Sequence, residues 1–332
     1  MGKLTGAGSI TANGAAGQPP RGGGGGGGRI AIYSDTNEFT GTISALGGPG
    51  PIYGGAGTIY LRDNRKPFGQ VLVDNGGFQG TNASVLSEET FDLTLLGRAA
   101  LNPLSAQLVV NSLSIQDDAV LTHLSYQTNL DLVILNDAVV KYGSAISADG
   151  KGYQAGPGAG QFNVDGGGGG YGGAGGASAS GTPGGPVYGS AQQPLERGSG
   201  GGLGVTGVSS SQGGGALRLS VGGTLFLEGT VSANGNDGFW EGAGGGSGGS
   251  VWITARQLVG TGLISVDGGG GEPFEGGDGG AGRIAINCPS NFFGGTISAS
   301  GGLGAFVGGQ GSLYASSGLP GLQIIGRVLP VP

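Results

Sequence analysis

The first indication of the fold is a short stretch, GTVSANG at 229–235, which recurs as GLISVDG at 262–268 and as GTISASG at 295–301. The central apolar residues of the first two copies are Val231 and Ile264, a step of 33 in the numbering, and the step to the third copy has the same length. A fixed short period is typical of a stacked array in which each repeat packs against its neighbours. The chain is therefore predicted to be a repeat protein.

A longer repeat encloses the short one. The segment 6–61 matches the segment 260–315 at a constant offset of 254 without a gap, and roughly half of the positions are identical, including RIAI at 29–32 and at 283–286. We expect the 332 residues to hold about one and a third units of a longer tandem array.

The region 91–142 shows the repeat in its plainest form. IQDDAV at 115–120 matches ILNDAV at 134–139, an offset of 19 in the numbering. Apolar residues alternate with polar ones, as at Leu113 and Ile115, which is the pattern of a half-buried strand. Short strand-like runs at this period, without helical periodicity, predict an all-β fold with one β-solenoid coil per repeat.

The difference between the two short periods, 19 in the plain region and 33 elsewhere, is close to the length of a glycine-rich tract. Three strand-like runs, SVWIT, QLV and GLISV, lie between positions 250 and 266, and a glycine-rich excursion follows at 268–282. We therefore predict coils of three short strands, with a glycine-rich loop leaving each long coil at the same corner.

Glycine supplies 85 of the 332 residues, where about 7% is usual. The glycines are clustered, and the largest glycine-rich excursion is 150–215. Such tracts are either disordered or packed as extended polyproline-II-like strands, because chains without Cβ can approach closely and exchange backbone hydrogen bonds. The regular position of the tracts favours a packed polyglycine layer on one side of the array.

The composition argues against several classes of function. The net charge is −7, and the 14 Lys and Arg residues form no run, whereas nucleic-acid binding needs clustered positive charge. The single cysteine, Cys288, has no partner for an internal disulfide. The sequence contains no apolar run as long as the roughly 18 residues that would predict a membrane span. Its GxGxxG-like strings open no predicted helix, so nucleotide binding is not predicted.

Strand alternation assigns an inner and an outer side to the GTISA-type runs. Val231 and Ile264 are predicted to stack inward with their counterparts. The outward positions would form a ladder of hydroxyls and amides at about 4.8 Å spacing. Interruptions at Leu46, Leu263 and Asp267 argue against ice binding. The predicted ladder, our candidate ligand-binding surface, consists of Thr42, Ser44, Thr230, Ser232, Asn234, Ser265, Thr296 and Ser298.

The strings GGGSGGSVWI, GTGLISVDGGG, GGAGRIAI and GGTISASGG, all within 244–302, resemble the glycine-rich repeats of very large bacterial cell-surface, adhesin-type proteins. The resemblance covers most of 1–61 and 143–315. It implies a right-handed parallel β-helix of pectin-lyase-like shape and an extracellular structural or adhesive role. It brings no active-site residues to this chain.

Parallel β-helices include polysaccharide lyases and hydrolases, whose sites gather carboxylates, often with a basic residue, on one external face. Because Asp favours turns, we interpret the aspartates of the plain region as corner residues. We predict no catalytic residue and no enzyme activity. The residues weighed for catalysis are Asp117, Asp118, Asp131 and Asp137, with Lys141 and His123.

A second chemical possibility is calcium, which prefers carboxylate and carbonyl oxygens. One glycine-rich loop and its border are acidic, but the equivalent loop at 14–28 has Gln18 and Arg21 at two of the acidic positions. A general calcium requirement is therefore not expected, and no other cofactor is predicted. The candidate metal ligands are Asp267, Glu272, Glu275 and Asp278.

Aromatic side chains in the glycine-rich regions have two interpretations. They could stack on sugars, since their rings offer flat apolar faces, or they could fill space between loops. The second is the simpler reading. The residues concerned are Trp240, Trp252, Tyr53, Tyr60, Tyr171 and Tyr188.

These patterns predict one continuous solenoid over 1–332, with glycine-rich coils at 1–61 and 143–332, plainer coils at 62–142, and a segment 255–315 that duplicates 1–61. The predicted function is that of a structural repeat segment, a spacer, stalk or fibre of a secreted or cell-surface protein. Its partner would be another copy or a tandem neighbour, joined end to end through exposed strand edges. The alternatives are a carbohydrate-binding adhesin of surface glycans, a polysaccharide-active enzyme and an ice-binding protein.

Overall fold

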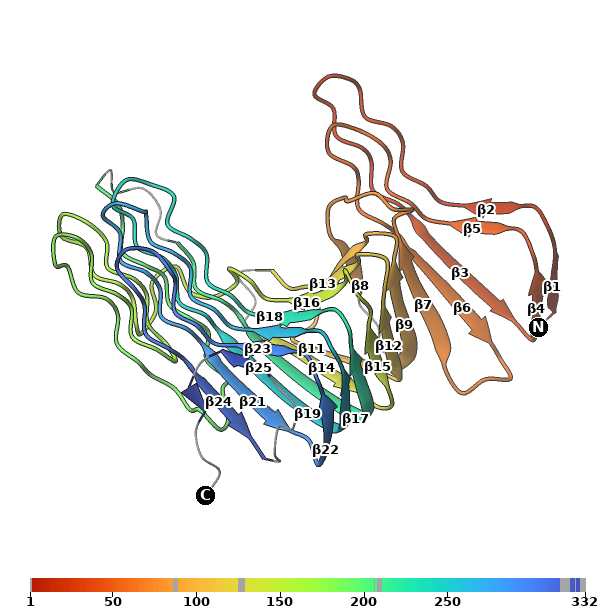
Figure 1. Cartoon of the computed structure of the whole chain (residues 1–332). Helices are drawn as coiled ribbons and strands as arrows, with labels where there is room; N and C mark the ends of the chain where they lie inside the picture. Colours follow the sequence, from red (N-terminus) through yellow and green to blue (C-terminus); the bar gives the residue numbers. More distant parts are fainter. Residues whose placement is uncertain are drawn as a thin grey trace. The chain divides into compact units, whose positions relative to one another are not determined.

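The computed structural model describes residues 2–85, 89–124, 129–205, 207 and 211–316, together with the backbone of 323–325 and 327–328. Every regular element in these residues is a β-strand (Figure 1), which confirms the all-β prediction. The chain divides into two compact units: unit 1 is Met1–Thr122 with Val133–Ala145, and unit 2 is His123–Leu132 with Ile146–Pro332. The single continuous solenoid over 1–332 stays a prediction.

Unit 1 contains one run of neighbouring strands in the order β3-β6-β7-β9-β12-β15, a second run β8-β10-β13, and the pairs β1-β4 and β2-β5. All the described pairs within these runs are parallel except β6–β7. The strands are β1 (Lys3–Gly6), β2 (Ser9–Thr11), β3 (Arg29–Ser34), β4 (Thr36–Phe39), β5 (Thr42–Ser44), β6 (Thr58–Asp63), β7 (Gly69–Asp74), β8 (Ala83–Val85), β9 (Phe91–Leu96), β10 (Ala100–Pro103), β11 (Gln107–Val110), β12 (Ser112–Ile115), β13 (Val120–Leu121) and β15 (Ala138–Val140). Two further strands, β14 (Leu130–Ile134) and β16 (Ala145–Ser147), cross the boundaries of the units.

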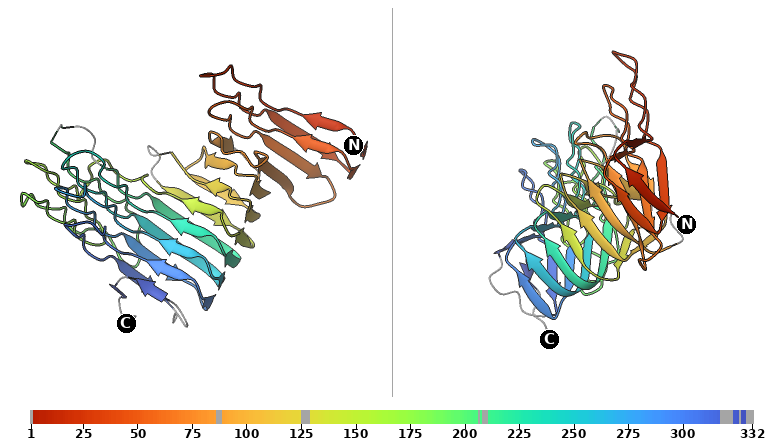
Figure 2. Two further views of the ribbon diagram at one scale, coloured as in Figure 1. Left: turned by 45° about the horizontal axis from the view of Figure 1, so that its top comes forward. Right: turned by 90° about the vertical axis from the view of Figure 1, so that its right-hand side faces the viewer.

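Unit 2 contains two runs of parallel strands, β17-β19-β21-β24-β26 and β18-β20-β23-β25, and β22 pairs with β19. Val231 lies opposite Ile264, and Ile264 opposite Ile297, so each copy of the short repeat places its strand beside the preceding one (Figure 2). The strands are β17 (Ala216–Leu227), β18 (Thr230–Ser232), β19 (Ser250–Gly260), β20 (Leu263–Ser265), β21 (Arg283–Asn287), β22 (Ser290–Phe293), β23 (Thr296–Ser298), β24 (Ser312–Ala315), β25 (Gln323–Ile325) and β26 (Arg327–Val328).

The long repeat is reproduced strand for strand. We call the segment 6–61 the N-terminal copy and the segment 260–315 the C-terminal copy. Arg29 pairs with Thr58 in the first and Arg283 with Ser312 in the second, which is the same register at an offset of 254. The pairs β1–β4 and β2–β5 recur in the same way as β19–β22 and β20–β23.

The core of each unit follows the alternation of the strands. In unit 2, Val251 and Ile253 of β19 are fully buried, while Trp252 between them is half-buried. In unit 1, Leu93 and Leu95 of β9 are buried and Thr94 is half-buried. Side chains on one side of the parallel strands therefore stack on their counterparts in the neighbouring strands.

The antiparallel pair β6–β7 exchanges the two sides of the sheet. Leu61 lies opposite Gln70, and Gln70 lies opposite Asp92, so these three side chains point the same way. The side of the sheet that carries the aliphatic Leu61 in β6 therefore carries the polar Gln70 in β7 and the polar Asp92 in β9. A turn rich in breaker residues, DNRKPFG at 63–69, makes the reversal.

The glycine tracts exchange backbone hydrogen bonds although most of their residues belong to no strand. In the tract 276–282, successive amides point in three directions that recur at every third position: to the outgoing arm of the same loop, to the segment 166–169, and to the following tract 306–309. The donor–acceptor pairs, at 2.7–3.0 Å, are Gly276–Glu272, Gly277–Gly166, Asp278–Phe306, Gly279–Gly269, Gly280–Gly169, Ala281–Gly309 and Gly282–Val266.

The tract 243–249 shows the same period of three. Its pairs are Ala243–Trp240, Gly244–Gly202, Gly245–Gly277, Gly246–Asn236, Ser247–Ser199, Gly248–Gly280 and Gly249–Ala233. Neighbouring backbones approach so closely that a Cβ built on Gly168 would lie 1.8 Å from the carbonyl oxygen of Asp278. Only glycine fits at such positions, which explains why the composition is so extreme.

Candidate functional site

Three serines of the predicted hydroxyl ladder lie in surroundings that the sequence did not suggest. Ser232, Ser265 and Ser298 are buried, so the prediction that they face solvent is wrong. Each hydroxyl donates to an acidic or amide side chain. The acceptors are Asp149 Oδ2 for Ser232 (2.9 Å), Asn234 Oδ1 for Ser265 (2.6 Å) and Asp267 Oδ1 for Ser298 (2.6 Å).

The same acceptor oxygens also tie the backbones of neighbouring repeats together. Asn234 Oδ1 accepts the amide of Asp267 at 2.7 Å, and Asp267 Oδ1 accepts the amide of Ser300 at 2.7 Å. Both bonds join positions that are one short repeat apart in the sequence. In the N-terminal copy, Asn13 accepts the amide of Leu46 at 2.8 Å. We call this set, Asp149, Asn234, Asp267 and Asn13 with their donors, the Asx ladder.

The hydroxyls of the three buried serines are all bonded within the Asx ladder. Of the remaining predicted ladder residues, Thr42 is exposed and Ser44, Thr230, Asn234 and Thr296 are half-buried. The Asx ladder could have been found from the sequence, since Ser-x-Asn at 232–234 and Ser-x-Asp at 265–267 recur at the step of the short repeat. Ligand binding by these five accessible residues stays a prediction.

The candidate calcium ligands belong to no metal-binding group among the described residues. Asp278 is buried and accepts the amide of Gly271 at 2.7 Å, and Glu272 accepts the amide of Glu275 at 3.0 Å. Desolvation, and then the charges of neighbouring acidic residues, raise the pKa of Glu275. No three or more His, Cys, Asp and Glu side chains in the described parts of the chain form a group that could hold a metal ion.

Four of the six residues weighed for catalysis are described by a turn or by side-chain contacts. Asp117 and Asp118 have φ angles of 54° and 58° and form a turn, as the corner interpretation predicts. Asp131 lies 3.9 Å from Arg218. His123 is buried, and its Nδ1 contacts the carbonyl of Leu124 at 2.9 Å. Burial lowers the pKa of His123 to about 4, so the ring is neutral at pH 7.

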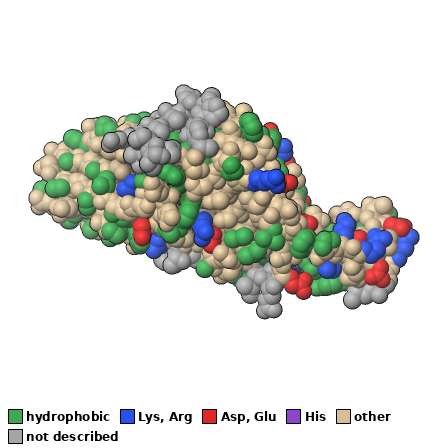
Figure 3. Space-filling model, turned by 90° about the horizontal axis from the view of Figure 1, so that it is seen from below, with side chains coloured by type: hydrophobic (Ala, Val, Ile, Leu, Met, Phe, Trp, Pro, Cys, Tyr) green, Lys and Arg blue, Asp and Glu red, His purple; other side chains and the backbone are tan. Residues whose placement is uncertain are grey.

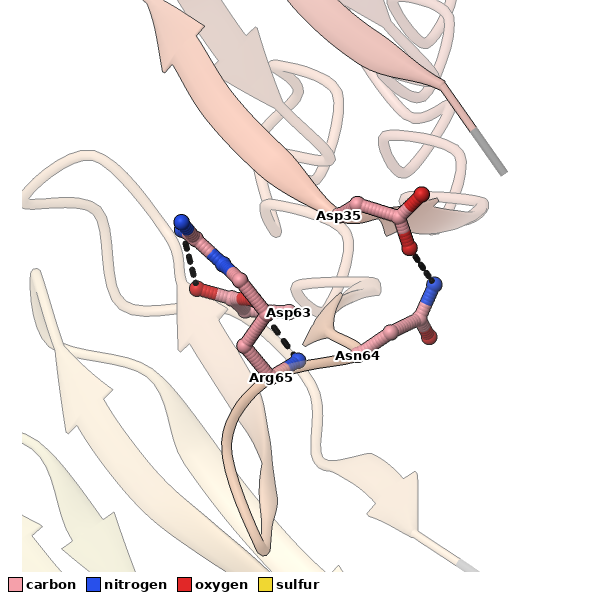
Figure 4. Close-up of polar contacts among 4 residues, drawn as sticks. All are labelled: Asp35, Asp63, Asn64 and Arg65. Atoms are coloured by element: carbon pink, nitrogen blue, oxygen red, sulfur yellow. Dashed lines mark hydrogen bonds and ion pairs between the residues drawn. The ribbon is translucent and has the colours of Figure 1, made fainter.

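A polar groove of about 540 Å³ lies in unit 1 along the ends of β3, β6 and β7. One of its walls carries the turn after β6, where Arg65 and Asp63 form two side-chain contacts of 3.1 Å and Asn64 donates to Asp35 at 2.8 Å (Figure 4). The hydrogen bond from Arg65 lowers the pKa of Asp63, and that from Asn64 lowers the pKa of Asp35. Leu61 and Gln70, which lie opposite each other across the antiparallel pair β6–β7, both line the groove.

A second groove, also of about 540 Å³, lies among the glycine loops of unit 2. Its lining includes Phe239 and Leu303, which are 81% and 84% exposed, beside Asp237 and Ser300. On the face shown in Figure 3, backbone and uncharged groups make up most of the surface, and charged side chains are densest at the right-hand end. This groove brings exposed apolar side chains and polar groups together in one hollow of the described surface.

The aromatic side chains weighed for sugar stacking differ in their surroundings. Tyr171 is fully buried, shares a hydrogen bond of 2.7 Å with the Ser250 hydroxyl and packs on Tyr188 with the ring centroids 4.8 Å apart. Trp252 is half-buried beneath Arg218. These three aromatic side chains fill space between chain segments, which favours the loop-packing interpretation for them. Trp240, at 53% exposure, is open to solvent, and Tyr53 stacks on Phe78 at 4.5 Å.

Comparison of the chain with family models, with curated proteins and with solved structures found no match. Among the described residues there is no helix of the length and apolar character that crossing a membrane requires.

Proposed function

We propose that the chain is a structural repeat segment, a spacer, stalk or fibre of a secreted or cell-surface protein. In this proposal the strands form a right-handed parallel β-helix, and the glycine tracts form a layer of polyproline-II-like chains beside it. The threefold period of the amide directions supports the second part, because a polyproline II helix has about three residues per turn and no internal hydrogen bonds.

One observation carries the proposal: three strand pairs, β1–β4, β2–β5 and β3–β6, recur in the same register at an offset of 254 in the numbering, as β19–β22, β20–β23 and β21–β24. A module that repeats its pairing so closely can be extended by adding further repeats, since each new repeat meets the same neighbouring surface. The Asx ladder supports the same role, because its polar side chains join neighbouring repeats.

Force spectroscopy tests the proposal. The full chain is held by its two ends and stretched, and a stacked array is expected to lengthen in steps, each releasing one repeat. One short repeat would add about 110–120 Å of extended chain. A single release of the whole chain at low force would contradict the spacer role.

The groove among the glycine loops favours a second candidate function, that of a carbohydrate-binding adhesin. Exposed aromatic rings beside carboxylate and hydroxyl groups are suited to sugars. A glycan array probed with the full chain and with Phe239→Ala tests this function. Phe292→Ala is the matched control, because Phe292 is 65% exposed and does not line the groove. Binding that is equal in both variants would contradict the adhesin role of the groove.

A further inference from the structure

The glycine tract 22–28 of the N-terminal copy has a hydrogen-bonding face that finds no acceptor among the described residues, whereas its duplicate 276–282 uses the same face. Five of its amides donate as in the C-terminal copy, in two of the three directions. The pairs are Gly22–Gln18, Gly25–Ala15 and Gly28–Ala12 within the loop, and Gly24–Ile52 and Gly27–Gly55 to the following tract. Gly23 and Gly26, which point in the third direction, donate to no residue that the structure describes.

In the C-terminal copy this third direction is filled by the segment 166–176, which we call the insertion tract. Gly277 and Gly280, the counterparts of Gly23 and Gly26, donate to the carbonyls of Gly166 and Gly169 at 2.9 and 2.8 Å. The insertion tract returns hydrogen bonds of its own. Its amides at Gly176 and Gly172 donate to the carbonyls of Asp278 and Ala281 at 2.7 and 2.9 Å.

The space around the two pairs of glycines differs in the same way. A Cβ built on Gly277 would lie 2.2 Å from the carbonyl oxygen of Gly176. A Cβ built on Gly23 would meet only the carbonyl oxygen of Ile52, at 3.6 Å, and one on Gly26 only that of Gly55, at 3.9 Å. Gly23 and Gly26 are exposed, whereas Gly277 and Gly280 are buried.

Each copy has an arginine directly after its glycine tract, Arg29 after 22–28 and Arg283 after 276–282. Arg283 donates from Nη2 to the carbonyls of Tyr188, at 2.7 Å, and of Tyr171, at 3.5 Å, and its guanidinium lies 5.4 Å from the ring centre of Tyr171. Both tyrosines belong to the excursion that contains the insertion tract. Arg29 is the counterpart at the offset of 254, and it is exposed.

We propose that the face formed by Gly23, Gly26 and Arg29 binds an extended glycine-rich polypeptide segment supplied in trans. The segment lies along 22–28 as the insertion tract lies along 276–282. The amides of Gly23 and Gly26 donate to its carbonyls, and Arg29 donates to a further carbonyl. Glycine is required at the contact positions, because the backbones approach to distances that exclude a Cβ. The proposal rests on this hydrogen-bond pattern and not on the spacer role, so either can fail without the other.

The probe is a capped synthetic peptide with the sequence of 165–177, DGGGGGYGGAGGA, added to the isotope-labelled full chain. We expect the amide resonances of Gly23 and Gly26 to shift, and their hydrogen exchange to slow at least tenfold at saturation. A peptide in which alanine replaces the glycines is expected to cause neither effect. The absence of shifts at millimolar peptide would overturn the proposal.

Two variants locate the site. Gly23→Ala with Gly26→Ala is expected to fold normally, as thermal unfolding will check, and to weaken peptide binding at least tenfold. Gly8→Ala is the matched control, since Gly8 is exposed and a Cβ there meets nothing within 4 Å. Equal binding by the double variant and the control would overturn the proposed location. Self-association that the double variant abolishes would assign the face to a second copy instead, which would overturn the choice of occupant.

Discussion

The N-terminal and C-terminal copies have the same strands and registers but very different surroundings. Ile284 and Ile286 of β21 are buried, whereas their counterparts Ile30 and Ile32 of β3 are half-buried. Ala285 is buried and Ala31 is exposed. The comparison shows that strand pairing in this protein is set locally by the repeat, while burial depends on what packs against the repeat from elsewhere in the chain.

The largest expected difference between the copies concerns their aliphatic cores. Ile284→Ala removes a fully buried side chain and is expected to lower the free energy of unfolding by about 2–5 kcal/mol. Ile30→Ala, at the equivalent half-buried position, is expected to cost less than half of that. Urea unfolding followed by hydrogen-exchange mass spectrometry measures both losses. Equal costs would show that the packing of the copies is the same, against the observed burial.

Acid is expected to affect the stability of unit 2, which contains the single histidine of the chain, more than that of the N-terminal copy. His123 belongs to unit 2, and burial lowers its pKa to about 4 from 6.5. The unfolded chain therefore binds more protons between these values, and stability falls as the pH drops through this window and levels off below it. The total loss is about 3 kcal/mol.

The fluorescence of Trp240 and Trp252, both in unit 2, follows this unfolding at a series of pH values. The His123→Asn variant is expected to show no His-dependent fall in the free energy of unfolding between pH 6.5 and 4. This holds whatever the substitution does to stability at neutral pH. If the free energy of unfolding of the variant falls as steeply with pH as that of the original chain, the acid sensitivity belongs to other groups.

A smaller difference is expected between matched glycines. A Cβ on Gly280 would lie 2.2 Å from the carbonyl oxygen of Gly173, so Gly280→Ala is expected to destabilise by about 1–3 kcal/mol. Gly26→Ala meets only one atom, at 3.9 Å, and is expected to change stability by less than about 0.5 kcal/mol. Thermal unfolding measures the stability of the two variants. A loss of stability in Gly26→Ala would contradict the observation that the face formed by Gly23, Gly26 and Arg29 is unoccupied by described residues.

The smallest expected difference lies in the Asx ladder. Asp267 accepts from Ser298 and from the amide of Ser300, so Asp267→Ala leaves a buried hydroxyl without an acceptor and is expected to cost about 1–3 kcal/mol. Asn13 is exposed and accepts the amide of Leu46, so Asn13→Ala is expected to cost about 1 kcal/mol or less. Chemical unfolding measures both changes in the free energy of unfolding. If Asp267→Ala causes no loss, the Asx ladder does not contribute to stability.

The sequence was sufficient to predict the strands and their step, because the alternation at Val231 and Ile264 and the short repeat are both visible in it. The three directions of the glycine amides were not predictable, since residues without side chains carry no sign of which neighbour they face. The burial of Ser232 and Ser265 was missed because strand alternation alone does not show what packs against the outer side of a strand. The reversal at β6–β7 had a signal in the turn residues Asn64 and Pro67, but its effect on the sides of the sheet needed the register.

The Asx ladder has a consequence for how the chain can misfold. A strand that slips by one position against its neighbour places Asp267 where it can accept neither the Ser298 hydroxyl nor the Ser300 amide, so small slips are penalised at every step. A slip by a whole short or long repeat presents the same partners again and meets no such penalty. The errors of assembly are therefore expected to come in whole repeats, as exchanged or skipped modules, and not as shifted strands.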